Sequence, residues 1–126
     1  MLFRSSGFEK TIAGNERAKM NKQQELIEAI RAFNESMDWN QFHTPENLAK
    51  SISIEAGELL ECFQWNNDYD HNEACEELAD VYSYCLMMAD AIGVDINQIT
   101  MDKLQQTKAK YPVEKYKGIS TKYNKL

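Results

Sequence analysis

Two pairs of acidic residues have the chemical type and the spacing needed to bind a divalent cation. Glu55 and Glu58 lie in the stretch SISIEAGELLECFQW, and Glu77 and Asp80 lie in EACEELADVYSYCLMMADAIG. Residues three apart on a helix are neighbours, so the members of each pair can converge on one point. Burying several ionised carboxylates together is very costly unless their charge is compensated. Arg31 and Lys50 are the only basic residues between 23 and 102 and are too few to neutralise this set, so a bound cation is the simplest explanation.

The ligand atoms indicate which cation to expect. All-oxygen ligation favours Mg²⁺ or Mn²⁺ over zinc or iron. Di-iron helical bundles use Glu-x-x-His pairs, whereas the two histidines of this chain, His43 and His71, fall in predicted loops. Mg²⁺ usually keeps several waters and is completed by substrate phosphates. We therefore expect a Mg²⁺ site, with Mn²⁺ as the alternative, that converts an acidic pocket into a phosphate site.

The helices that must position these acids follow from the apolar periodicity. In a projection at about 100° per residue, Glu55 falls inside the apolar arc of its helix and Glu58 at its margin, while Glu61 faces nearly the opposite way. On the next helix Glu77 lies on the flank of the arc, and Asp80 lies one turn further on the same side. The two arcs consist of Leu48, Ile52, Ala56, Leu59, Cys62 and Phe63, and of Ala74, Leu78, Val81, Cys85, Met88 and Ile92.

The whole chain of 126 residues is predicted to be all-α and to form one folding unit. Thr44 is the expected N-cap of the second helix, with Pro45 at its first position. Gly93 should end the third helix, and Asp95 with Gln98 forms a capping-box variant that starts a fourth. The stretches that contain the predicted helices are 21–39, 43–65, 73–93 and 95–112, and in the second of them His43 precedes the N-cap and stays in the loop. We expect an N-terminal extension at 1–19, a helical domain at 20–112, and a basic tail with weak structure signals at 113–126.

Charge and cysteine content exclude several classes of protein. The segment 23–102 holds most of the 20 acidic residues but only two basic ones, Arg31 and Lys50, so it should repel nucleic acid. Three cysteines without a C-x-x-C pair argue against a disulfide framework and against a zinc site. The chain has neither a membrane span nor a signal-peptide pattern. We therefore expect a cytoplasmic protein that binds neither nucleic acid nor membrane.

Three stretches of the sequence resemble a known family. WNQFHTPENLAKSISIEAGELLECFQW, EELADVYSYCLMMADAIGVDI and KYPVEKYKG are similar to the MazG-like nucleotide pyrophosphohydrolases, in the short single-domain branch near the dCTP pyrophosphatases. The similarity covers about residues 24–118 and centres on the family's pattern E-x-x-E, spacer, E-x-x-D. It implies a four-helix-bundle protomer of the all-α NTP pyrophosphatase type, assembled as a homo-oligomer. A dimer of dimers is favoured, with a dimer as the alternative.

The resemblance also implies an activity and roles for the four acids. Members of the family cleave a (d)NTP between the α and β phosphates, which yields a monophosphate and pyrophosphate and removes surplus or non-standard deoxynucleotides. Glu55, Glu58, Glu77 and Asp80 would hold Mg²⁺ against the triphosphate. Glu55 and Glu58 are the catalytic candidates, and we favour Glu55 as general base because its more apolar surroundings should raise its pKa most.

Substrate-binding residues are implied in the same way. The family matches suggest that aromatic and polar residues around the second helix line the nucleotide pocket and that residues of the fourth helix contact phosphates. Ile30 stands where a dCTP-preferring relative has histidine, and Thr107 stands where relatives often have asparagine, so strict dCTP preference is not expected. The substrate-binding candidates are Trp39, Phe42, His43, Trp65, Tyr84, Lys103, Thr107 and Lys110.

Other interpretations of the same residues stay open. The acids could be solvated or paired at a subunit interface, the aromatics could belong to the core, and Lys103 and Lys110 could form a solvated basic face. A non-enzymatic helical interaction module would then use the apolar stripes to bind a partner. A metal-storage bundle is disfavoured because the helices lack histidine, and related dUTPases and phosphoribosyl-ATP pyrophosphohydrolases differ only in substrate.

Overall fold

The computed structural model describes residues 20–65 and 68–125, and every regular element in these ranges is helical. The all-α prediction is therefore confirmed. The expected N-terminal extension at 1–19 lies outside the described residues. The elements are α2 (Lys22–Ser36), η1 (Asn40–Phe42), α3 (Pro45–Glu61), α4 (His71–Ile92), α5 (Ile96–Lys110), α6 (Val113–Tyr116) and η2 (Tyr123–Lys125).

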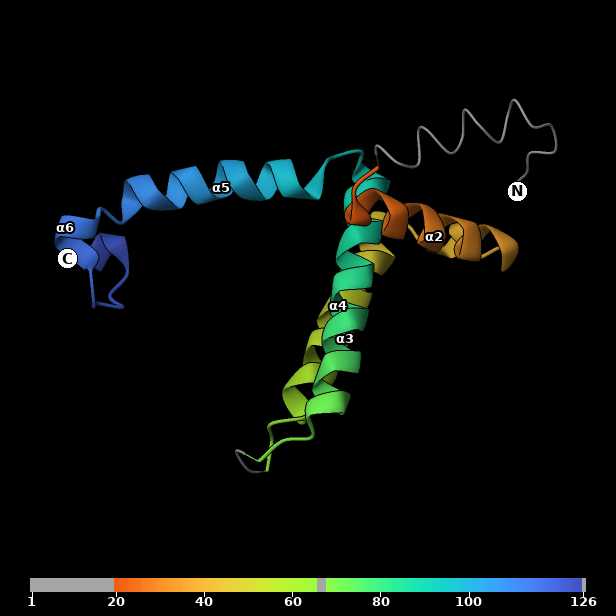
Figure 1. Cartoon of the computed structure of the whole chain (residues 1–126), viewed down its shortest axis with the longest axis horizontal. Helices are drawn as coiled ribbons and strands as arrows, with labels where there is room; N and C mark the ends of the chain where they lie inside the picture. Colours follow the sequence, from red (N-terminus) through yellow and green to blue (C-terminus); the bar gives the residue numbers. More distant parts are fainter. Residues whose placement is uncertain (1–19, 66–67, 126) are drawn as a thin grey trace. The chain divides into compact units, whose positions relative to one another are not determined.

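The chain divides into two compact units, residues 1–92 and 93–126. In the first unit, α3 and α4 lie side by side and run in opposite directions, and α2 also packs against α4 (Figure 1). Leu48 of α3 and Leu86 of α4 are almost completely buried, because they lie on the apolar arcs along which these helices meet. Three of the four predicted helices thus belong to the first unit, and α5 belongs to the second.

The helix boundaries follow from local capping. Asn21 accepts a hydrogen bond from the Gln24 amide at 2.8 Å and completes a capping box on α2. The Thr44 hydroxyl accepts from the Asn47 amide at 3.2 Å, which confirms it as the N-cap of α3. Gly93 has a positive φ of 74°, a conformation that favours glycine, and it follows the last residue of α4 as predicted.

Two predicted boundaries differ in detail. Asp95 caps α5 by accepting from the Gln98 amide at 3.1 Å, but the Gln98 side chain donates to Asp102 instead of returning to the cap. The box is therefore only half formed. His71, which we expected in a loop, is the first residue of α4, because Asp70 caps this helix earlier by accepting from the Glu73 amide at 3.1 Å.

The second unit contains more structure than the tail composition predicted. Residues 113–116 form α6, and Tyr116 is buried. Its hydroxyl donates to the carbonyl of Tyr123 at 2.9 Å, and the Tyr123 amide donates to the hydroxyl of Tyr111 at 3.2 Å. The ring of Tyr111 packs edge-on against both other rings. These aromatic contacts order the basic tail, and neither its charge nor its periodicity indicated them.

Among the described helices none is both long enough and apolar enough to cross a membrane.

Candidate functional site

The antiparallel packing of α3 against α4 brings three of the four predicted acids together. Carboxylate oxygens of Glu55, Glu77 and Asp80 lie within 4.8 Å of one another. We call these three residues the carboxylate cluster. Glu55 and Glu77 are half-buried and Asp80 is exposed. One member of the first i, i+3 pair and both members of the second thus lie together, as the spacing predicted, whereas Glu58 is not in the cluster.

Glu58, the fourth predicted acid, lies beside the cluster and is exposed. A hydrogen bond from the Glu58 carboxyl, burial, and the negative charges of Glu58, Asp80 and Glu77 together raise the pKa of Glu55 to about 7. Burial, followed by the charges of Glu58 and Asp80, also raises the pKa of Glu77. Both shifts mean that, without a bound cation, the folded protein disfavours the state in which all of these carboxylates are ionised.

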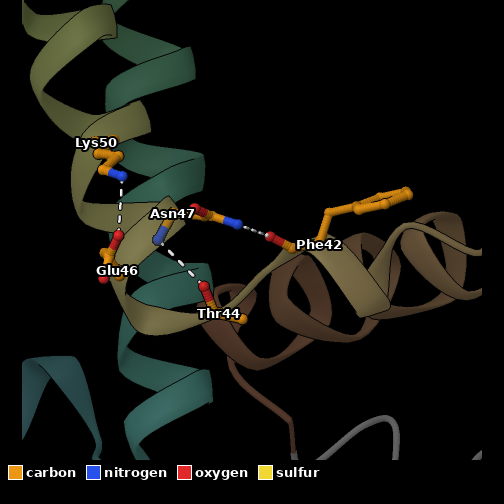
Figure 2. A network of polar contacts seen from close by, with 5 residues as sticks. All are labelled: Phe42, Thr44, Glu46, Asn47 and Lys50. Carbon is orange, nitrogen blue, oxygen red and sulfur yellow. Dashed lines mark hydrogen bonds and ion pairs between the residues drawn. The ribbon is translucent and has the colours of Figure 1, made fainter.

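Two basic residues of the described first unit, Arg31 and Lys50, are paired with acids outside the cluster. The guanidinium of Arg31 is paired with Asp90, to which its Nε donates at 2.9 Å. The ammonium of Lys50 donates to Glu46 at 2.8 Å (Figure 2). One carboxylate oxygen of Glu55 and one of Glu77 are buried without a hydrogen-bond partner among the described residues. Buried carboxylate oxygens that lack a hydrogen-bond partner and lie close together are suitable ligands for a hard divalent cation.

The raised pKa of Glu55 predicts how the stability of the metal-free protein depends on pH. Its pKa lies at about 7 in the folded chain against an ordinary value of 4.5, so protonated Glu55 favours the folded state. That contribution is complete below about pH 4.5 and is lost as the pH rises through about 7. The melting temperature of the metal-free protein should therefore fall between about pH 5 and pH 8, as measured by circular dichroism in the presence of a chelator.

A Glu55→Gln variant provides the control, because glutamine carries no titrating proton. Its melting temperature should fall less than that of the wild type over the same range. The Arg31–Asp90 pair does not interfere, because its hydrogen bond lowers the pKa of Asp90, and that contribution is lost only in more acidic solution. An equal slope in both proteins would contradict the assignment to Glu55.

An aromatic cavity adjoins the carboxylate cluster. It has a volume of about 340 Å³ and lies between α2, η1 and α4. Its wall includes three of the predicted substrate-binding residues, Trp39, His43 and Tyr84, and also Asp80 of the cluster. We call it the aromatic cavity. Asp80 therefore belongs to the cation-binding candidates and to the cavity wall at the same time.

Local structure fixes the aromatic side of this cavity. Asp38 has a positive φ of 55°, which turns the chain after α2 so that the amide of Trp39 donates to the carbonyl of Asn34 at 2.9 Å. The indole then packs edge-on against Phe33, with ring centroids 5.4 Å apart. Gln41 supports the turn by donating to the carbonyl of Asp38 at 3.0 Å. Trp39 is thus held by the backbone as well as by its ring.

His43 is positioned by the turn that leads from η1 into α3. The Asn47 side chain donates to the carbonyl of Phe42 at 2.9 Å, and the Thr44 hydroxyl caps the Asn47 amide (Figure 2). These bonds bracket His43, whose Nδ1 is buried without a partner among the described residues. A second cavity of about 200 Å³ shares His43, Ile30, Asn34 and Met87 with the aromatic cavity.

Two predicted aromatics lie elsewhere. Phe42 is 57% exposed and its ring projects away from α3 (Figure 2), and its main-chain carbonyl supports the turn instead. Trp65 follows α3 and is 84% exposed. Neither residue belongs to the walls of the two cavities. Their roles in substrate binding stay predictions.

The three candidates on α5 belong to the second compact unit. The Thr107 hydroxyl donates to the carbonyl of Lys103 at 3.1 Å, a bond within the helix itself. The ammonium of Lys110 lies 5.1 Å from the centroid of the Tyr123 ring, which is a cation–π distance. Their predicted phosphate contacts stay predictions.

The fold and the site together define an all-α protein in which two antiparallel helices share a carboxylate cluster beside an aromatic cavity. This chain belongs to the MazG-like family, whose model matches residues 50–126. The family resemblance seen in the sequence is therefore confirmed.

Individual relatives agree with this assignment. The chain is 35% identical over 104 residues to dCTP pyrophosphatase 1 of Mus musculus, a match that covers 75% of this chain and 61% of that protein. The Homo sapiens protein of the same name is 34% identical with the same coverage. A solved pyrophosphatase from Archaeoglobus fulgidus is 37% identical, with a TM-score of 0.68, and the match covers 74% of this chain and 94% of that one. The chain thus spans less than two thirds of the curated relatives.

The structure adds two features that the sequence analysis did not assign. One is the Arg31–Asp90 ion pair between α2 and α4. The other is Asn34, which is buried and lines both cavities. Asn34 follows Ile30 by four residues and Ile27 by seven, so it stands on the apolar side of its helix. A polar residue on the apolar side of a helix indicates a functional role, as it did for Glu55. The indication is weaker for Asn34 because its side chain is uncharged.

Proposed function

We propose that this protein is a nucleotide pyrophosphohydrolase that cleaves a (d)NTP between the α and β phosphates. The observation that carries the proposal is the double role of Asp80, which joins the carboxylate cluster to the wall of the aromatic cavity. A nucleotide whose base enters this cavity would have its phosphates beside the cluster. The names of the relatives, dCTP pyrophosphatase and pyrophosphatase, support the same reaction.

The reaction needs a divalent cation, and we propose Mg²⁺, with Mn²⁺ as a substitute. The clustered, unpaired carboxylate oxygens fit such an ion. Glu55, Glu77 and Asp80 would hold it, with Glu58 as the further ligand that the family pattern implies. When bound, the cation supplies positive charge against the triphosphate and acts as a Lewis acid.

Within this scheme Glu55 is the general base. A water oxygen forms a bond to the α-phosphorus while the bond from that phosphorus to the bridging oxygen breaks, and pyrophosphate leaves. The proton of the water passes to the carboxylate of Glu55. Glu58 shares a hydrogen bond with Glu55, so it orients the base and can take part in relaying the proton.

We propose a deoxynucleoside triphosphate as substrate, either dCTP-like or taken from a broad set, with removal of surplus or non-standard deoxynucleotides as the biological role. Trp39 and Tyr84 offer ring surface for stacking the base, since stacking on aromatic side chains binds any base. Phe42 and Trp65 would complete the enclosure, and Lys103, Thr107 and Lys110 would contact sugar or phosphates.

A hydrolysis panel tests the proposal. The full chain is incubated with Mg²⁺ and each of dCTP, dUTP, dTTP, dATP, dGTP and a modified dCTP, and the products are identified by chromatography. We expect monophosphate and pyrophosphate. Diphosphate and phosphate would show that the nucleotide binds in another register. No turnover of any nucleotide would favour the helical interaction module, for which the exposed side chains of Ile54, Leu60 and Leu78 would supply a surface.

We further propose a homo-oligomer, a dimer of dimers in preference to a dimer. The exposed apolar side chains of Ile54, Leu60 and Leu78 on α3 and α4 support it, because large apolar side chains left exposed on a helix pair can be buried between subunits. Light scattering coupled to gel filtration should give a mass above that of the 14.6 kDa chain. A Leu60→Glu variant should shift the distribution toward smaller species. A wild-type mass equal to that of one chain would contradict this proposal.

A further inference from the structure

Asn34 is a buried residue whose side chain pairs with no described residue. Asn34 is the one polar residue in the buried set of the described chain, with 7% of its surface exposed. Its main-chain carbonyl accepts from the Trp39 amide at 2.9 Å, but its side chain makes no hydrogen bond to any described residue. Buried polar groups are nearly always hydrogen-bonded, because an unpaired one loses its hydration without replacement. The amide atoms of Asn34 are not among the fully enclosed unpaired atoms, so the amide is open to the cavities that it lines and is available to pair with a ligand.

The position of the amide indicates where that ligand binds. Asn34 lines the aromatic cavity and the second cavity, so it stands where the two meet. Trp39, His43 and Tyr84 surround the same space, and Asp80 connects it to the carboxylate cluster. Nδ1 of His43 is also buried and unpartnered. A cavity with aromatic walls and a few unpaired polar groups is typical of a site for a flat heterocycle.

We propose that Asn34 is a base-recognising residue whose amide binds the hydrogen-bonding edge of the substrate's base. The inference rests on the proposed function, because it assigns the base end of the same site. An amide presents one acceptor and one donor group side by side. It can pair in bidentate fashion with a base edge that presents a neighbouring donor and acceptor, as asparagine does with adenine in DNA.

The same amide can accept both kinds of pyrimidine. Cytosine presents an N4–H donor beside the N3 acceptor, whereas uracil and thymine present the O4 acceptor beside the N3–H donor. Because no described residue fixes which way the amide faces, a half-turn about its last side-chain bond matches either order. Ile30, in the same walls, offers no polar group to bias the choice. Cytosine and uracil nucleotides should therefore be used with efficiencies that differ by less than about tenfold.

Replacement of Asn34 by leucine tests the assignment, because leucine has a similar size but can neither donate nor accept. The kcat/KM for dCTP and for dUTP should both fall by about 10- to 100-fold. Hydrolysis of a deoxyribose 5′-triphosphate that lacks a base should not change. The matched control is Asn72→Leu, which makes the same chemical change at an exposed residue outside both cavity walls, so it should leave the ratio between dCTP and the base-free substrate unchanged.

A binding measurement separates this inference from the proposed function. Calorimetric titration with dCMP and dUMP requires no turnover, and Asn34→Leu should weaken both affinities by about 10- to 100-fold. If the leucine variant unfolds, as judged by circular dichroism, Asn34→Ala replaces it. Unchanged monophosphate affinity in a folded variant, or a wild-type preference for dCTP over dUTP of more than about 1,000-fold, would overturn the role of Asn34. Wild-type binding without hydrolysis would overturn only the proposed function, and the absence of both would overturn the two together.

Discussion

Asp80→Asn should reduce kcat/KM for the preferred nucleotide by at least about 100-fold. Loss of an outer-shell partner of a metal ligand typically costs about 10- to 100-fold in metal affinity or activity, and here a member of the cluster itself loses its charge. Asp80 also forms part of the aromatic cavity wall, so the substitution changes the place where phosphates and base meet. The affinity for Mg²⁺, measured by calorimetric titration, should fall in parallel with turnover.

Glu61→Gln is the matched control for this experiment. It removes one acidic charge from the same helix pair, but Glu61 is the exposed last residue of α3 and stands outside the cluster. Its turnover and Mg²⁺ affinity should stay close to those of the wild type, since isolated surface charges interact weakly in water. If Asp80→Asn kept full activity, the cluster would not be the active site and the interaction module would become the better interpretation.

The acids could be predicted from sequence because helical period constrains side-chain direction. Glu55 interrupted the apolar arc of its helix, and Glu77 and Asp80 lay on the flank of the next, so their convergence required only that the two helices pack in antiparallel fashion. The helical period could not predict which of the four acids would form the cluster and which would lie beside it. Glu58 stands at the margin of its arc, and in the structure it is exposed and bound to Glu55.

The aromatic cavity was harder to predict from the helical period. Trp39 and His43 lie in turns, where no period applies, and their positions depend on a positive φ at Asp38 and on side-chain bonds from Gln41 and Asn47. The contacts of the tail had the same origin, since they join tyrosines across turns. Local bonds of this type depend on backbone geometry that composition does not encode.

Asn34 shows where physical reasoning from sequence could have reached further. A single asparagine on the apolar side of a short helix is a weaker signal than a carboxylate, because an amide is less costly to bury and can often find a partner. Only the structure shows that Asn34 is buried, that its side chain pairs with no described residue and that it lines both cavities. The useful signal was thus polarity at an apolar position, regardless of charge.

Glu55→Gln should lower the activity of the enzyme but raise the stability of the metal-free protein at about pH 8. If Glu55 is the general base, the glutamine variant should lose about 10²- to 10⁴-fold in kcat, because a positioned base contributes about that much. At about pH 8, however, the metal-free variant should melt at a higher temperature than the wild type. The wild-type chain must hold an ionised Glu55 against its neighbours at that pH, whereas glutamine carries no charge.

Glu58→Gln decides between the two catalytic candidates. It leaves the carboxylate of Glu55 in place and removes only the charge and one acceptor of its exposed neighbour, so its loss in kcat should be smaller than that of Glu55→Gln. The pKa of Glu55 should also fall, because the first cause of its elevation is the bond to Glu58. The pH dependence of metal-free stability would then shift to lower pH. A larger loss of kcat in Glu58→Gln than in Glu55→Gln would transfer the role of base to Glu58 and leave Glu55 as a ligand.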